Sequence, residues 1–422
     1  MRHVLLAACV LGVACTPLER GPFQLRIGSV GPLAALTPGT QRSASGYAQE
    51  WVFEPLLRTA RDGSPIPALA ASFEFLSPAR VVVELRQGAK FSDGSPVTAE
   101  DVRRSLQEAG LDVREQPHGL LIESPSGVPV EPILRHEMVY KRIADTYIGS
   151  GPFRMVSVNP ERLLLRRVVP APGKIDEVLL LGFPNTRDPF AHALAGDTDL
   201  LMVTDPKQLE FFQGISRLRV IRGHGANAIA VAMGFNRLGR AARSSIAAAL
   251  PVESISKLVF GNECLPFSIR DDKSAAMPAR PLEVAVIAQD LALEHTGLAV
   301  ARALGRHGGN VRLVSATDAL RMLKSQDFDL LLLRPLVWPP SSAALVWASD
   351  SRFNDLGYRN PKVDAALKAG DWARALQALG EDPPVAFICT PERLAVVDSR
   401  VKNPQVGPYG YLETLPDWEI AE

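Results

Sequence analysis

The stretch 80–106 places the strongest constraint on the fold, because it encodes a strand, a tight turn and a capped helix in immediate succession. Its first part, RVVVELR, alternates and is rich in β-branched residues, as expected of a half-buried strand. Asp93 and Gly94 then supply a turn, since glycine readily adopts a positive φ. Thr98 and Asp101 form a capping-box pair at a helix start, and the apolar residues that follow recur one turn apart. The stretch specifies structure, and none of its residues suggests catalysis.

Other segments carry the same kind of signal and indicate an α/β protein with mixed sheets. A helix over 186–196 is closed by Gly196, and helical character also appears at 46–58. Two further helices over 241–261 are separated at Pro251, because proline cannot continue a helix. The strands expected in this region are 161–168, 175–183, 200–203 and 228–236.

The last third of the chain predicts a parallel sheet. A strand at 282–288, an amphipathic helix at 291–308 and a strand at 310–315 form a βαβ unit, which requires a right-handed crossover. The helix-strand step is then repeated over 317–326 and 328–333. No sequence period recurs, which argues against a solenoid or a propeller.

Length and charge limit the function classes. A chain of 422 residues is too long for one ordinary core, so two or three domains are expected. Its 46 basic and 46 acidic residues give a formal net charge of +0. This balance disfavours nucleic acid or an anionic membrane surface as the main partner, because both reward a basic excess.

The N-terminal segment MRHVLLAACVLGVAC is typical of an export signal, with a basic start and a short apolar run that ends in small residues. A buried N-terminal strand is the alternative interpretation. A signal that ends at Cys15 resembles a bacterial lipoprotein processing site, although Gly12 stands where leucine is usual; Cys9 is the other candidate. We therefore expect residues 1–15 to be a signal peptide and Cys15 to be lipid-modified. No later run is long enough for a transmembrane helix.

The residues that usually carry catalysis or bind metals do not form a recognisable pattern. H-E-x-x-H and C-x-x-C are absent, and the Gly-His-Gly sequence at 223–225 is only half of a dinucleotide fingerprint. We therefore expect no enzyme activity, no cofactor and no metal site. Cys264 and Cys389 would remain after processing, and they could either pair in an oxidising compartment or stay as separate buried thiols.

Several motifs together resemble the bacterial extracellular solute-binding proteins of family 5, the peptide- and nickel-binding receptors of ABC importers. The most specific are FEPLLRTARDGSPIPALAASFEF at 53–75 and VVVELRQGAKFSDGSPVTAEDVRRSL at 81–106. The others follow in the family's order: GSGPFRM at 149–155, AHALAGDTDLL at 191–201, VAMGFN at 231–236 and YRNPKVDAAL at 358–367. The likeness covers nearly the whole chain after the signal, but the chain is short for the family, mainly between Leu106 and Gly149.

This resemblance implies a two-lobed fold of the periplasmic-binding-protein type II kind, with mixed sheets, a hinge and a small extra domain. Ligand would be captured between the lobes as they close, with chain crossings expected near Asn262 and Pro391. The expected parts are 1–15 signal peptide, 22–50 first segment of lobe 1, 51–149 small second domain, 150–262 second segment of lobe 1, 263–394 lobe 2, and 395–422 C-terminal segment of lobe 1.

The resemblance also suggests residues that contact the solute. They are Asn236 at the end of its strand, Trp338 as an apolar wall, Arg334 as an anion partner and Gly151 in the Gly-Ser-Gly-Pro turn. The alternatives for the first three are a turn residue, a core residue and a surface charge. Peptide receptors of the family carry an acid for the peptide amine after the strand equivalent to 328–333, whereas here no carboxylate follows until Asp350. The solute is therefore expected to be neutral or anionic.

Two functions from different classes fit these patterns. The first is a lipid-anchored, extracytoplasmic receptor of the cell envelope, monomeric, that delivers a peptide-like or other small organic solute to the permease of an ABC transporter. The second is a lipoprotein with the same binding fold that has lost transport and serves in envelope interaction or sensing. In both, the membrane is contacted only through the N-terminal lipid, and nucleic acid is not a partner.

Overall fold

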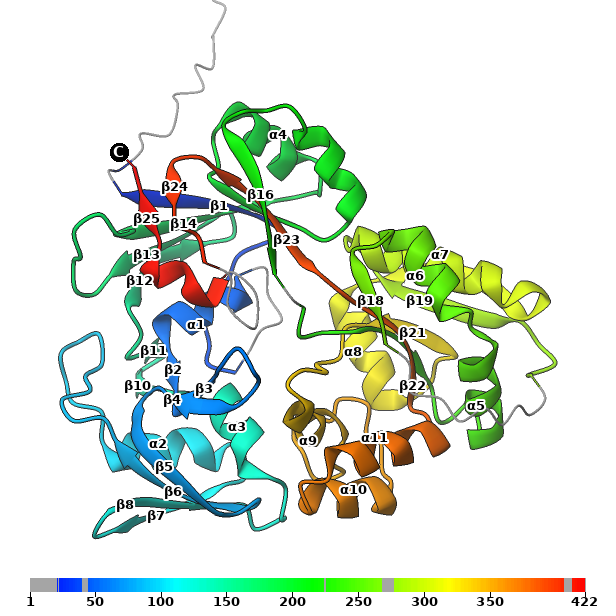
Figure 1. Cartoon of the computed structure of the whole chain (residues 1–422), viewed down its shortest axis with the longest axis horizontal. Helices are drawn as coiled ribbons and strands as arrows, with labels where there is room; N and C mark the ends of the chain where they lie inside the picture. The colour runs from blue at the N-terminus through cyan, green and yellow to red at the C-terminus, as the bar shows by residue number, and fades with distance from the viewer. Residues whose placement is uncertain are drawn as a thin grey trace, which may run out of the picture.

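The computed structural model describes residues 21, 23–39, 45–223, 225–267, 277–405 and 412–421. Cys15 and Cys9 lie outside these ranges. The described chain forms two lobes, each built on its own sheet, and a small domain that lies below lobe 1 and beside lobe 2 (Figure 1). The three parts are named lobe 1, lobe 2 and the small domain below.

Lobe 1 is built on a mixed seven-stranded sheet of order β12-β13-β14-β1-β15-β23-β16. Its central strand β1 runs parallel to β14 and β15, while β13, β23 and β16 are antiparallel to their neighbours. The elements are β1 Gln24–Val30, η1 Gly46–Ala48, α1 Gln49–Val52, β12 Phe153–Asn159, β13 Arg162–Arg167, β14 Glu177–Phe183, α4 Asp188–Ala195, β15 Leu200–Val203, η2 Pro206–Phe212, β16 Leu218–Gly223, β23 Arg393–Asp398, β24 Val401–Lys402, η5 Leu412–Asp417 and β25 Glu419–Ile420.

Lobe 2 is built on a six-stranded sheet of order β18-β22-β17-β21-β19-β20. The expected βαβ unit is present, since β19 pairs in parallel with both β20 and β21. The elements are β17 Ile229–Met233, α5 Arg240–Ala249, α6 Val252–Phe260, β18 Cys264–Pro266, β19 Leu282–Ile287, α7 Leu291–Ala303, η3 Gly305–His307, β20 Gly308–Val314, α8 Ala316–Ser325, β21 Leu330–Leu333, η4 Pro340–Ser342, α9 Ala343–Trp347, α10 Pro361–Lys368, α11 Trp372–Glu381 and β22 Val385–Pro391.

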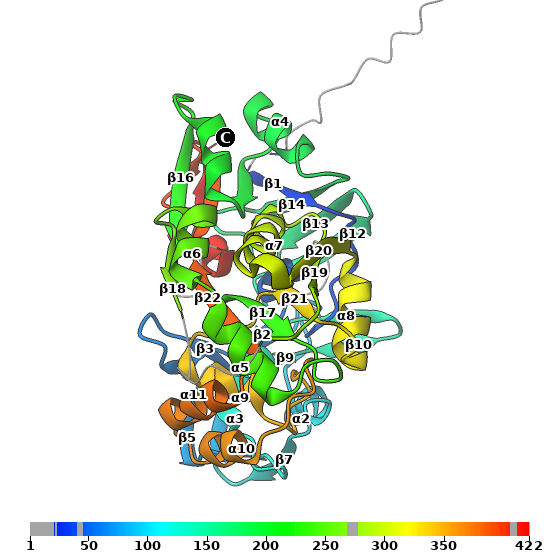
Figure 2. The same cartoon turned by 90° about the vertical axis from the view of Figure 1, so that its right-hand side faces the viewer.

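The sheet of lobe 2 is buried on both faces, which explains the apolar composition of β17. Successive side chains of a strand point to opposite faces. Ile229, Val231 and Met233 accordingly belong to a core with α5, α6 and α7, while Ala230 and Ala232 belong to a second core on the other face. Figure 2 shows α6 and α7 in front of this sheet.

The small domain contains the stretch that opened the sequence analysis, and its local predictions are confirmed. β6 is the expected strand, and Thr98 and Asp101 form the capping box at the start of α2. The main sheet has the order β5-β6-β8-β7 and packs on α2 and α3. The elements are β2 Glu54–Pro55, β3 Leu57–Thr59, β4 Pro65–Pro67, β5 Ala70–Ser77, β6 Arg80–Leu85, α2 Ala99–Gln107, β7 Asp112–Gln116, β8 Gly119–Glu123, α3 Val130–His136, β9 Met138–Val139, β10 Lys141–Ile143 and β11 Thr146–Ile148.

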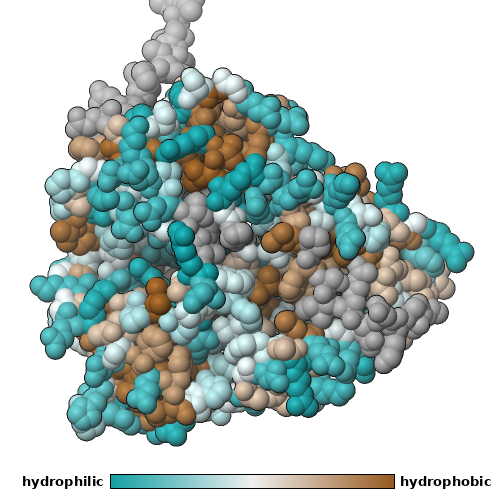
Figure 3. Space-filling view, viewed as in Figure 1, coloured by the Kyte–Doolittle hydropathy of each residue, from teal (hydrophilic) through white to brown (hydrophobic). Residues whose placement is uncertain are grey.

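The face of the molecule seen in Figure 3 is mainly hydrophilic, with separate hydrophobic areas. One of these lies over the β5–β6 hairpin. β5 carries the exposed Leu76, whereas Phe73 and Phe75 lie opposite the buried Val83 and Val81 of β6 and pack against the core. One face of the hairpin therefore packs into the core, and the other, with Glu74 and Leu76, is exposed because helices cover this sheet on one side only.

The chain crosses between the lobes at two places. One crossing lies between the end of β16 at Gly223 and the start of β17 at Ile229, and the other is Glu392, between β22 and β23 (Figure 1). The expected boundary at 262/263 and the first crossing near Asn262 are therefore wrong. The helices α5 and α6 and the strand β17 already belong to lobe 2, and the sequence of a strand does not reveal which sheet it joins.

Several element lengths differ from the expectation: the helix expected over 291–308 ends at Ala303, and two other differences share one cause. Helical structure near residue 46 ends at Val52, because Glu54 and Pro55 instead form a strand that pairs with Met138 and Val139. The strand expected to end at Asn236 ends at Met233. In both cases pairing with a distant segment sets the end of the element.

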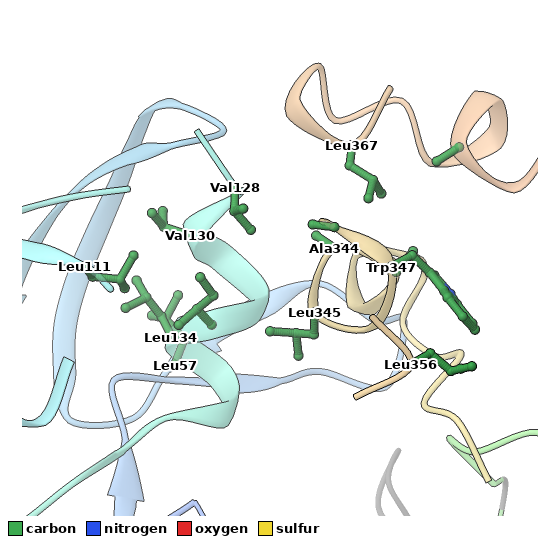
Figure 4. Close-up of a cluster of buried hydrophobic side chains, with 14 of the residues drawn as sticks. Leu57, Leu111, Val128, Val130, Leu134, Ala344, Leu345, Trp347, Leu356 and Leu367 are labelled. Atoms are coloured by element: carbon green, nitrogen blue, oxygen red, sulfur yellow. The ribbon is translucent and has the colours of Figure 1, made fainter. Parts of the chain in front are cut away.

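The small domain and lobe 2 share a continuous hydrophobic cluster. We call the part of this cluster where α3 meets α9 the interlobe joint. Figure 4 shows Leu345 of α9 directed toward α3, the helix that carries Val130 and Leu134. All three side chains are buried. Polar contacts flank the joint, among them a hydrogen bond of 3.3 Å from Ser341 Oγ to Glu131 Oε1. The structure is thus closed on this side, with lobe 2 resting on the small domain.

Candidate functional site

A cavity of about 390 Å³ lies where lobe 1, the small domain and lobe 2 meet. Four segments that are distant in sequence line it: the loop after β1, the C-terminal end of α2, the β10–β11 hairpin with its flanks, and the loop between α9 and α10. The lining residues are Thr37, Pro38, Gly39, Glu108, Tyr140, Tyr147, Arg352 and Phe353. A larger hollow of about 540 Å³ lies between α10 and α11 within lobe 2 alone, so movement of the lobes would not enclose a ligand there.

Two tyrosines form the wall that the small domain contributes. Tyr140 precedes β10 and Tyr147 lies within β11, and the two rings meet edge to face with centroids 5.3 Å apart. The backbone amide of Tyr140 donates to Ser105 Oγ at 3.1 Å, which fixes the backbone at Tyr140 to α2. Burial raises the pKa of Tyr140 to about 12, and its hydrogen bond to the Glu108 side chain adds to this shift. The hydroxyl therefore stays protonated at neutral pH.

Lobe 2 contributes Arg352 and Phe353, and both are held against the small domain. The Arg352 guanidinium forms an ion pair with Glu137, and its Nη1 donates to the backbone oxygen of Glu108 at 3.0 Å. The Phe353 ring meets His136 edge to face at 4.9 Å, and the Arg352 guanidinium lies over the same ring, also at 4.9 Å. These contacts place both residues at the cavity only when the lobes are together.

The titratable groups beneath the cavity are shifted by burial. The pKa of His136 is lowered to about 4, first by desolvation and then by the charge of Arg352. Desolvation also raises the pKa of Glu137, and the ion pair with Arg352 opposes this effect. At neutral pH, His136 is therefore neutral, and Arg352 faces a carboxylate that has little solvent around it.

The residues predicted from the sequence lie elsewhere in the described chain, and Asn236, Trp338, Arg334 and Gly151 do not line this cavity. Asn236 is exposed, and its amide donates to the carbonyl of Ser325 at the end of α8 at 2.8 Å. It therefore has the role of a turn and capping residue in this structure.

Arg334 and Trp338 follow β21 and contact protein groups. Arg334 makes two hydrogen bonds of 2.8 and 2.9 Å to the carboxylate of Asp290, so its charge is already compensated. The ring of Trp338 lies beside Gly63 of the small domain, 3.4 Å from the point where a Cβ would stand. Trp338 is thus part of the contact between lobe 2 and the small domain, next to the cis peptide bond to Pro339.

Gly151 serves packing. Its amide donates to the carbonyl of Val52 at 2.9 Å, and a Cβ at this position would lie 2.6 Å from the carbonyl oxygen of Trp51. A side chain would therefore displace the backbone that follows α1. This close approach explains why the Gly-Ser-Gly-Pro turn needs glycine here.

Cys264 and Cys389 form a disulfide between β18 and β22, with their Cα atoms 5.7 Å apart. This decides between the two alternatives that the sequence left open. Both cysteines are buried in the core of lobe 2, close to the crossing at Glu392. The disulfide fixes the edge strand β18 to the strand that leads into lobe 1.

The sequence analysis missed the cavity residues because they come from separate segments. Tyr140 and Tyr147 belong to the region between Leu106 and Gly149, which was noted only as shortened. A usable signal was present there, since two tyrosines lie seven residues apart, one before and one within a short hairpin that carries Lys141 and Arg142. Aromatic residues with a polar tip are common in binding sites.

Two observations on the described residues concern metal binding and membrane spans. Their histidine, cysteine, aspartate and glutamate side chains form no group of three or more that could hold a metal ion. Within the same ranges, every helix is too short or too polar to cross a bilayer.

Comparison with known proteins identifies solved structures with a similar fold. No family model matches the chain, and no curated protein matches it in sequence. Solved structures match over nearly the full length. DppA from Helicobacter pylori, an ABC transporter-associated periplasmic binding protein in complex with the peptide STSA, gives a TM-score of 0.77 at 12% identity, covering 94% of this chain and 98% of that one.

Two other matches carry different ligands. NikA from Staphylococcus aureus in complex with Ni(L-His)2 gives a TM-score of 0.75 at 15% identity, covering 93% of this chain and 98% of that one. The PBP AgaA from A. tumefacien R10 in complex with agropinic acid gives 0.78 at 16% identity, with 94% and 99% covered. The structural neighbours are solute-binding family 5 proteins, so the expected two-lobed fold with mixed sheets is confirmed.

Proposed function

We propose that this protein is an extracytoplasmic solute-binding receptor that delivers a peptide-like or other small organic solute to an ABC transporter. The observation that carries the proposal is the cavity between the two lobes and the small domain, with two tyrosines, a phenylalanine and charged groups on its wall. Binding sites at domain interfaces with aromatic walls and a few polar groups are typical of small-molecule receptors. The ligands of the structural neighbours support the same class of function.

Closure of the lobes gives this site its mechanism. The crossings at 223–229 and at Glu392 are short, so a few backbone rotations there would move lobe 2 relative to lobe 1. Arg352 and Phe353 would then leave the small domain and expose the wall formed by Tyr140 and Tyr147. A solute would bind to the open wall and be covered when the lobes close.

The location follows from the N-terminal segment and is supported by the disulfide. Disulfides persist in oxidising compartments, which include the bacterial periplasm and cell surface. We propose that Cys15 carries a lipid that anchors the protein to the membrane. Metabolic labelling with a fatty acid tests this, because Cys15→Ser should abolish the label. Retention of the label after this substitution would make Cys9 the modified residue.

Native mass spectrometry of protein purified from the cell envelope without denaturation tests the binding function. We expect a small molecule to remain bound, and its removal should increase the radius of gyration in small-angle X-ray scattering. A protein that carries no small molecule and keeps its size would favour the rival function, an envelope lipoprotein with a binding fold but no transport.

A further inference from the structure

We infer that the cavity selects a solute with a cationic amine next to an apolar group, and that Glu108 is the carboxylate that binds this amine. The inference rests on the proposed binding function and specifies its substrate class. It corrects the expectation of a neutral or anionic solute, which considered only the segment after β21. The carboxylate of the cavity comes from a different segment, the end of α2.

The aromatic walls are the first support. Tyr140, Tyr147 and Phe353 line the cavity together with Glu108. Aromatic faces attract cations through their quadrupole, and this attraction strengthens when water is excluded. The structure already shows the effect on two of these rings, since Arg142 lies 5.7 Å from the centroid of Tyr147 and Arg352 lies 4.9 Å from that of Phe353.

The distribution of charge is the second support. Two cations near the cavity have carboxylate partners, Arg352 with Glu137 and Lys141 with Asp93 at 2.9 Å, and Arg142 donates to the backbone oxygen of Ala144 at 3.1 Å. Glu108 contributes the carboxylate of the wall, and its side chain is exposed. It accepts a hydrogen bond from the Tyr140 hydroxyl, which orients it and leaves further lone pairs for a ligand.

The cavity can hold only a limited solute. A volume of about 390 Å³ lies at the lower end of the range for small-molecule sites. An ammonium group at Glu108 would place the adjoining part of the solute against the two tyrosine rings. Quaternary ammonium compounds and the free N-terminus of a short peptide both have this chemistry.

Two matched ligand pairs separate charge from shape. The first is trialanine and N-acetyl-trialanine, and the second is choline and its neutral isostere 3,3-dimethylbutan-1-ol. Binding of all four to the full-length protein, stripped of any bound molecule, is measured by calorimetric titration. Glu108→Gln removes the charge but keeps an oxygen that can accept from Tyr140, and Glu74→Gln makes the same charge change at an exposed site on β5 outside the cavity.

We expect the cationic member of at least one pair to bind about 10- to 100-fold more tightly than its neutral partner. The peptide ammonium would gain a charge-assisted hydrogen bond, whereas choline, which has no N–H group, would gain ion-pair and cation–π contacts. Glu108→Gln should remove this preference, while Glu74→Gln should preserve it. The inference is overturned if no cationic probe binds, if the neutral probes bind equally well, or if the preference survives in Glu108→Gln. A neutral or anionic molecule found by native mass spectrometry would also overturn it and would leave the proposed receptor function intact.

Discussion

Replacing Leu345 with Ala is expected to separate lobe 2 from the small domain without unfolding either part. Leu345 is 3% exposed and points from α9 toward α3 across the interlobe joint (Figure 4). In an open molecule this side chain would face water. Its burial therefore stabilises the closed arrangement more than it stabilises the fold of lobe 2.

The size of the effect follows from the buried side chain. A fully buried leucine shortened to alanine costs about 2–5 kcal/mol, and the lower part of that range suits a contact between domains, where the neighbours can adjust. A loss of about 2–3 kcal/mol changes the ratio of closed to open molecules by roughly 30- to 150-fold.

Small-angle scattering and thermal unfolding distinguish this prediction from plain destabilisation. Leu345→Ala should increase the radius of gyration at 25 °C. The control is Leu332→Ala in β21, a fully buried residue of the lobe 2 core, which should lower the unfolding temperature without changing the size. Refutation would be an unchanged size in Leu345→Ala with a fall in unfolding temperature like that of the control.

Three other changes test further parts of the structure. Because the pKa of His136 is lowered to about 4 in the folded state, its contribution to stability should be complete above pH 6.5 and be lost as the pH falls from 6.5 toward 4; His136→Gln should flatten the pH dependence of the unfolding temperature in this window. Reducing the Cys264–Cys389 disulfide should lower the unfolding free energy by about 2–5 kcal/mol in urea titrations, and a double Ser variant should then show no response to reductant. Gly151→Ala should lower the urea midpoint by an amount equivalent to about 1–3 kcal/mol, whereas Gly239→Ala, where a Cβ would meet nothing within 4 Å, should leave the midpoint nearly unchanged; equal effects would contradict the packing role of Gly151.

The local features of the fold could be predicted from the sequence because neighbouring residues determine them. The capping box at Thr98 and Asp101 and the closure of α4 by Gly196, with φ of 88°, both involve residues within one turn. The parallel pairing of β19 with β20 could also be predicted, since a strand, a helix and a second strand in close succession leave few other topologies. These elements needed no knowledge of the rest of the chain.

Pairing between distant segments could not be predicted. β17 lies between β21 and β22 in the sheet. β21 comes about 100 residues later in the chain and β22 about 150 residues later. The periodicity of β17 shows that it is buried on both faces but does not show in which lobe. The first crossing was misplaced for this reason, and the strand end at Met233 likewise depends on its partners.

The choice of site residues failed for a related physical reason. Arg334 is a cation near a strand end, but Asp290, 44 residues earlier, compensates its charge. Glu108 carries no signal in the sequence, and only the approach of Tyr140 and of the loop at Arg352 makes it part of a wall. A motif can identify the scaffold, whereas the ligand-binding groups depend on which charges remain after the protein has formed its own pairs.

The charge of the cavity is therefore coupled to the position of lobe 2. In the closed structure Arg352 neutralises Glu137 and donates to the backbone oxygen of Glu108, so the side chain of Glu108 is left as the negative group on the wall. Movement of lobe 2 away from the small domain would remove Arg352 and leave two carboxylates, Glu108 and Glu137, on the open surface. An amine would then meet a more acidic surface before closure than after it. Closure returns Arg352 to Glu137, which compensates the buried carboxylate and leaves the exposed side chain of Glu108 to pair with an ammonium group.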